Sequence, residues 1–153
     1  MNKVELSAID RKILNCIQED IPLRPEPFKI LSKKLKIEEK KLLDRIRLLK
    51  DRGVIRRFAA GINHRKLGFR STLLGMKVSM DKLDAIVKEI VVYPEVTHCY
   101  LREGEYNLWI VFICPEKGEL DSFLNILAKR IGRRNILNLR TKRQFKLKTV
   151  LKV

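Results

Sequence analysis

The sequence predicts an α+β protein made of two small domains, because two hydrophobic patterns follow one another along its 153 residues. Up to about residue 52, apolar residues recur every three or four positions, which is typical of amphipathic helices. From residue 71 onward, strand-like runs alternate with helical stretches. We therefore expect a helical domain over residues 1–60, a connector over 61–70 and a mixed domain over 71–153. Domains this small have thin cores, so an oligomer is expected.

The first domain has the pattern of a winged helix-turn-helix. Ser7 can cap the first helix, and Glu38 and Glu39 suit the positive amino end of the third. The three helices and the short strand VIRRF that follows them are predicted over residues 7–20, 27–35, 38–52 and 54–58.

The second domain has the element order βαββαβ, which is that of the ferredoxin-like fold. Its elements are predicted as a strand at 71–78, a helix at 81–92, hairpin strands at 96–102 and 107–113, a helix at 118–131 and a final strand at 136–150. We expect helices on one face of the antiparallel sheet, with the other face left for a ligand or a partner chain.

The net charge of +16 suggests nucleic-acid binding, but the distribution of the charge argues against it. Residues 1–53 carry 14 Lys/Arg against 9 Asp/Glu, and residues 54–128 carry 10 against 9. Residues 129–153 carry 10 basic residues and no acidic ones, so the excess lies far from the helix-turn-helix. Much of it can also be ordinary solvated surface.

Cysteine spacing and hydropathy exclude several classes of protein. Cys16, Cys99 and Cys114 contain no CxxC pair, so neither a disulfide framework nor a metal site is expected. No apolar run approaches the roughly 20 residues that span a bilayer, and the amino end lacks a secretory pattern. We expect a cytoplasmic protein without membrane contact.

One predicted strand carries the sharpest group of functional side chains. Because alternate residues share a face, His98, Tyr100 and Arg102 lie together, and Cys99 and Leu101 point to the core. The neighbouring strand adds an aromatic wall and an amide through Tyr106, Asn107 and Trp109. The alternatives are a structural histidine at position 98 and core or interface packing for the two aromatic residues.

Several segments resemble known families. IDRKIL at 9–14 and GVIRRFAAGINHRKLGF at 53–69, with the βαββαβ half, resemble the Lrp/AsnC family, most of whose members are DNA-binding regulators. Three further segments resemble the siroheme decarboxylases, and YLREGEYNLW is closer to their alpha-type subunit. These segments are QEDIPLRPEPF at 18–28, PEVTHCYLREGEYNLW at 94–109 and RQFKLKTV at 143–150.

The second resemblance implies a substrate, siroheme, that carries iron and eight carboxylates, two of whose acetate arms become methyl groups. It implies no cofactor beyond this tetrapyrrole, and a paralogous second subunit forming a heterodimer, with a homodimer as the alternative. Carboxylates require cations, for which we single out Arg56, Arg57, Arg65, Arg102 and Lys146.

The chemistry also needs a proton, which histidine donates readily near neutral pH. We expect His98 to be the general acid and Tyr100 to orient the substrate. His64 can act as a second acid, as an axial iron ligand or at the partner chain's site.

Two other functions stay open. A DNA-binding regulator would place the third predicted helix in the major groove, with Arg56 and Arg57 in a wing that contacts phosphate. That helix also carries four acidic residues and uses its leucines for the core, so specific DNA binding is not expected. A haem-sensing or scaffold role without catalysis is the third possibility.

Overall fold

The computed structural model describes residues 4–146 and 150–153, which form two compact units. One unit combines Met1–Ala60 with Lys146–Val153, and the other is Gly61–Phe145. The last residues of the chain thus belong with the helical unit, whereas the sequence pattern had assigned them to the mixed domain.

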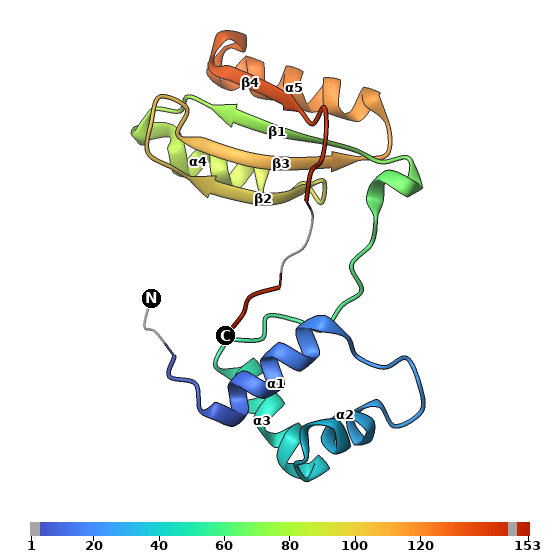
Figure 1. The fold of residues 1–153 in the computed structure, drawn as a ribbon. Coiled ribbons are helices and arrows are strands. Elements are labelled where there is room, and N and C mark those ends of the chain that lie inside the picture. Colours follow the sequence, from blue (N-terminus) through green and yellow to red (C-terminus); the bar gives the residue numbers. More distant parts are fainter. Residues whose placement is uncertain (1–3, 147–149) are drawn as a thin grey trace. The chain divides into compact units, whose positions relative to one another are not determined.

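The helical unit contains α1 (Ala8–Glu19), α2 (Pro27–Leu35) and α3 (Glu39–Asp51), as predicted (Figure 1). The Ser7 hydroxyl accepts a hydrogen bond from the Asp10 amide and begins α1, because a side-chain oxygen satisfies an amide that the first turn leaves free. The core of this unit consists of apolar side chains from all three helices, including Ile13, Leu31 and Leu42.

The predicted strand over 54–58 is wrong. The backbone N–H groups of Val54 and Ile55 both donate to the Leu49 carbonyl, at 2.9 and 3.1 Å. These bonds tie the segment to the end of α3, so these two amides are not available to a strand ladder.

The carboxyl-terminal residues pack along α1 in the same unit. The side-chain amide of Gln18 bonds both the N–H and the carbonyl of Leu151, at 2.9 and 3.0 Å. Asn15, one turn earlier, bonds both backbone groups of Val153, at 2.8 and 3.1 Å. Two amide side chains thus take the place of a neighbouring strand for the last residues of the chain.

The second unit has the predicted βαββαβ order and an antiparallel sheet in the order β2-β3-β1-β4 (Figure 1). Short 3-10 turns, His64–Leu67 and Arg133–Asn135, precede β1 and β4. Its strands and helices are β1 (Arg70–Met76), α4 (Met80–Ile90), β2 (Val96–Leu101), β3 (Leu108–Cys114), α5 (Lys117–Ile131) and β4 (Ile136–Arg140).

Both helices cover the same face of this sheet, as expected. The core joins alternate residues of the central strands, such as Leu74 and Ile110, to Ile86 of α4 and Phe123 of α5. Phe123 also stacks on Phe112, with ring centroids 4.5 Å apart. We call the other side of the sheet, which these helices do not cover, the open face.

The final strand is shorter than predicted. β4 ends at Arg140, and residues 141–146 are not in a strand; residues 147–149 of the predicted strand lie outside the described residues. The last β1–β4 pair is Thr72 with Arg140, close to the start of β1 at Arg70. The chain leaves the sheet here, although Ser71 and Arg70 of β1 continue beside β3. Among the described helices, none has the length and apolar character that a membrane crossing requires.

Candidate functional site

The open face is built from two rows of residues that run across the strands. The strand registers align Tyr100, Trp109, Gly75 and Leu137 in one row, and His98, Val111, Leu73 and Leu139 in the next. Cross-strand neighbours on one face lie about 5 Å apart, so each row is continuous across the sheet. The open face therefore combines a flat apolar floor with an imidazole and a phenol at the β2 edge.

Trp109 lies across Gly75, and this contact makes the floor flat. A Cβ at position 75 would be 2.9 Å from the nearest indole carbon, closer than real Cβ contacts come. The indole Nε1–H donates to the Tyr106 carbonyl at 2.7 Å, which fixes the ring in this orientation. Because Gly75 has no side chain, the indole can pack flat against the backbone of β1.

A β-bulge between Val96 and His98 directs the histidine to the open face. Val96 pairs with Phe112, whereas His98 pairs with Val111, so Thr97 is an extra residue in β2. Val96 packs against the helix-covered core, and a regular strand would have turned His98 to that side as well. Because of the bulge, β2 buries Val96 in the core and places the His98 side chain on the open face.

The side chains at the β2 edge lie within reach of one another. The His98 and Tyr100 rings have centroids 6.0 Å apart, and the Arg102 guanidinium carbon lies 5.6 Å from the Tyr100 ring centroid. A cavity of about 300 Å³ is lined by Leu73, Tyr100, Arg102, Trp109, Ile110 and Val111. His98 is exposed, and its Nδ1 lies 3.1 Å from the Thr97 hydroxyl. The arrangement can offer a cation, a phenol and a proton donor beside an apolar wall.

Cys99 and Leu101 face the other way, as the alternation predicted. Cys99 pairs with Ile110 and packs against the core, and burial raises the pKa of its thiol. A protonated, half-buried thiol is a poor nucleophile, so Cys99 serves packing. Leu101 pairs with Leu108 on the same side but stays exposed.

The structure gives Asn107 and Tyr106 roles in the hairpin. The Asn107 amide accepts from the Val78 N–H at 2.9 Å and donates to the Val78 carbonyl at 2.7 Å. This side chain therefore joins the start of β3 to the end of β1, and both of its polar atoms are engaged there. The Tyr106 ring has the Lys77 ammonium 5.0 Å from its centroid, and its carbonyl holds the Trp109 indole.

The other predicted site residues are not members of these two rows. His64 is in the turn before β1, and its Nε2 is buried without a hydrogen-bond partner among the described residues. Arg65 follows it in the same turn and borders a different cavity. Arg56, Arg57 and Lys146 are exposed and belong to the helical unit.

The sequence patterns did not indicate Gly75, Thr97, Leu73 or Leu139 as parts of the site. A glycine inside a strand was the available signal, because such a glycine often marks a close approach of another group. Bulges leave no comparable mark in a single sequence.

Comparison with known proteins first defines the general class. A family model described as the AsnC-like ligand binding domain matches residues 66–146. The crystal structure of an AsnC family transcriptional regulator from Agrobacterium tumefaciens superposes with a TM-score of 0.77. It is 25% identical and the match covers 95% of this chain and 96% of that one. The fold is therefore that of the AsnC-like proteins.

Further comparisons narrow the class to one family. The siroheme decarboxylase NirDL-like HTH domain model matches residues 10–56. The siroheme decarboxylase alpha subunit of Desulfovibrio desulfuricans is 42% identical, over 94% of this chain and 83% of that protein. The crystal structure of the siroheme decarboxylase NirDL with an iron-uroporphyrin III analogue is 37% identical, with a TM-score of 0.68, over 92% of this chain and 46% of that one. The chain belongs to the siroheme decarboxylase family.

Proposed function

We propose that this chain is one subunit of a siroheme decarboxylase and that its open face holds the substrate. The observation that carries the proposal is the row of Tyr100, Trp109 and Gly75 beside His98, in a chain 42% identical to a siroheme decarboxylase alpha subunit. The regulator alternative is not favoured, because the regulator structure shares less of the sequence, at 25% identity.

The apolar floor suits one side of a flat tetrapyrrole. Leu73 and Val111 are neighbours in one row, and the Trp109 indole covers the next row at Gly75. Dispersion contacts over such a floor hold the macrocycle but do not fix its orientation in the plane of the ring. The orientation is then set by the charged rim, where Arg102 can bind one of the substrate's non-reacting carboxylates.

Decarboxylation of an acetate arm needs one proton for each carbon dioxide released. The bond between the methylene carbon and the carboxylate breaks, carbon dioxide leaves, and the electron pair stays on the methylene carbon conjugated with the pyrrole. His98 gives a proton to this carbon, which becomes a methyl group, and Tyr100 orients the arm. Because His98 is exposed in the single chain, it can recover a proton from water before the second arm reacts.

A second, related chain completes the site. Leu73 and Leu139 of the open face are 38% and 46% exposed, and Tyr100 is 50% exposed. A partner that covers this floor would exclude water from the reacting carboxylate. Without its hydration the charged group is less stable, which favours its departure as neutral carbon dioxide. We take the partner to be the paralogous subunit, and a second copy of this chain is the alternative.

His64 has a place in this scheme because no residue in the described part of the chain forms a hydrogen bond with its buried Nε2. A buried ring nitrogen without a partner costs about 1–3 kcal/mol, so an absent group is expected to meet it. The iron, a carboxylate of the substrate and a residue of the second subunit are the three candidates.

The decisive experiment is anaerobic incubation of siroheme with this chain and its paralogous subunit, followed by mass spectrometry of the tetrapyrrole. The proposal predicts a product lighter by two carbon dioxide molecules. Siroheme that binds and keeps its mass in the mixture would instead support the sensing or scaffold role.

A further inference from the structure

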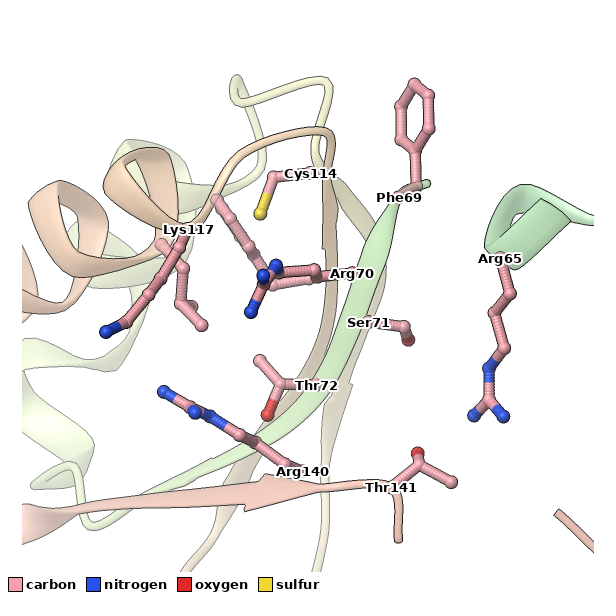
Figure 2. A pocket seen from close by; sticks show the side chains of 11 residues that line it. Arg65, Phe69, Arg70, Ser71, Thr72, Cys114, Lys117, Arg140 and Thr141 are labelled. Carbon is pink, nitrogen blue, oxygen red and sulfur yellow. The ribbon is translucent and has the colours of Figure 1, made fainter. Parts of the chain in front are cut away.

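A second cavity lies on the helix-covered side of the sheet, where β1 and α5 begin and β3 and β4 end. Its volume is about 240 Å³, and four of the side chains that line it are cationic, whereas none is acidic. We call it the basic pocket and define it by Arg70, Lys117 and Arg140 around a floor of Thr72, Phe112 and Leu120. Arg65, the fourth cation, lies on the far side of β1 from the other three (Figure 2).

The strand registers separate the basic pocket from the open face. Thr72 pairs with both Phe112 and Arg140, and Arg70 pairs with Cys114. Phe112 and Cys114 belong to the helix-covered core, so Arg70 and Arg140 start from that face of the sheet. The sheet thus stands between these arginines and a tetrapyrrole lying on Trp109, and the cavity is too small to admit a macrocycle.

The three cations lie on the same side of β1, and no acidic side chain lines the cavity with them. Figure 2 shows the Arg70 and Arg140 guanidinium groups and the Lys117 ammonium on this side. None of the three makes an ion pair with an acidic residue in the described part of the chain. Glu95 and Glu119 act on the Cys114 thiol nearby, but neither lines the cavity.

The floor and the helix end complete a site for an anion. Thr72, Phe112 and Leu120 are buried at 3%, 2% and 4% exposure, so the cations surround a depression and not a flat patch. Lys117 begins α5, a helix of 15 residues whose first turn has no side-chain cap. Its free N–H groups add to the attraction for negative charge.

We infer that the basic pocket binds a small anion with two or more negative charges, at a site separate from the open face. Three cations would leave charge unbalanced around a singly charged ion. The apolar floor favours an anion with a carbon skeleton, such as a di- or tricarboxylate, and a small phosphate compound shares the same charge chemistry. The inference does not depend on the proposed decarboxylase activity.

Calorimetric titration of the full chain tests the inference, with citrate and pyrophosphate as probes at near-physiological salt. Saturable binding of either probe is expected, and citrate binding without pyrophosphate binding, or the reverse, assigns the carboxylate or the phosphate source. Arg70→Gln and Arg140→Gln should each raise the dissociation constant of the probe by about tenfold or more, because each variant loses a charge-assisted contact. Arg134→Gln is the matched control, because Arg134 precedes β4 at its other end and does not line the pocket.

Three results would overturn the inference. One is the absence of saturable binding of both probes to the parent chain. Another is equal weakening in the Arg134→Gln control, which would reflect net charge alone. The third concerns siroheme, whose binding is followed by its visible spectrum: a large loss of siroheme affinity in Arg140→Gln would make the pocket part of the substrate site. Unchanged siroheme affinity supports two separate sites.

Discussion

Arg45 on α3 holds Asp10 on α1 through two hydrogen bonds, from Nε to Oδ1 at 2.8 Å and from Nη2 to Oδ2 at 2.6 Å. Asp10 is 2% exposed, and it also accepts hydrogen bonds from the Ser7 amide and hydroxyl. The Arg45 guanidinium is the main cause that lowers the pKa of Asp10 from 3.8 to about 2. Arg45 lies on the helix that a DNA-binding regulator would place in the major groove, but its guanidinium is engaged in joining α3 to α1.

This pair predicts a specific loss of stability in acid. Asp10 stays ionised in the folded protein down to about pH 2, whereas the unfolded chain takes up this proton near 3.8. The contribution is complete above about pH 4 and is lost as the pH falls toward 2, and it amounts to about 2 kcal/mol. Asp10→Asn should lower the free energy of unfolding at about pH 6, and its difference from the parent should shrink toward pH 2.

Urea unfolding, followed by circular dichroism, measures the free energy of unfolding of the parent and of Asp10→Asn between about pH 6 and pH 2. Asp44→Asn is the control, because Asp44 and its partner Arg47 are both exposed and such pairs contribute little. A difference between Asp10→Asn and the parent that is constant with pH would contradict the assignment.

The same geometry predicts weak DNA binding without sequence preference. Arg45 is engaged by Asp10, and Arg47 lies 3.2 Å from Asp44 on its own helix. The guanidinium groups of α3 thus face carboxylates already, and the remaining lysines support contacts with phosphate that salt weakens strongly. Gel-shift titration at near-physiological salt checks this. Tight binding to one defined palindrome, lost on Arg47→Ala, would instead indicate a regulator.

Gly75→Ala should disturb the floor of the candidate site. The added methyl group would lie 2.9 Å from the Trp109 indole, so the ring must move away from the strand. Overpacking of this kind costs about 1–3 kcal/mol. Because Trp109 is the only tryptophan, its fluorescence should shift in this variant, and siroheme should bind more weakly.

Gly118→Ala is the matched control for this substitution. A Cβ at position 118 meets no atom within 4 Å, so fluorescence and siroheme binding should both stay at the parent's values. Identical emission and affinity in Gly75→Ala and the parent would mean that the indole does not rest on Gly75 in solution.

Most of the fold could be predicted because local patterns determine it. The Ser7 cap, Pro27 at the start of α2 and the alternation of β3 each act within a few residues. The errors arose where the backbone of a segment makes its hydrogen bonds outside a sheet. Val54 and Ile55 bond to Leu49 at the end of α3, and the chain leaves the sheet after Arg140, with Leu151 and Val153 bonded to Gln18 and Asn15 of α1.

The candidate site could be predicted in part for the same reason. Period-two alternation placed His98, Tyr100 and Cys99 on their observed sides of β2. The bulge at Thr97 depends on the register with β3, which one strand cannot reveal. The role of Asn107 depends likewise on Val78, almost thirty residues away, and the basic pocket combines residues from three separate stretches of the chain.

The central claim is that His98 supplies the proton in decarboxylation on the open face, and the rate of carbon dioxide release by the His98→Ala variant tests it most directly. The measurement uses anaerobic mixtures with siroheme and the paralogous subunit, with siroheme binding followed by the visible spectrum. General acid catalysis is typically worth about 100-fold to 10,000-fold, so His98→Ala should slow release by that factor while siroheme binding stays largely intact. Arg102→Ala should weaken siroheme binding instead. A His98→Ala rate within a few-fold of the parent would contradict the account and leave His64, Tyr100 or the second subunit as the source of the proton.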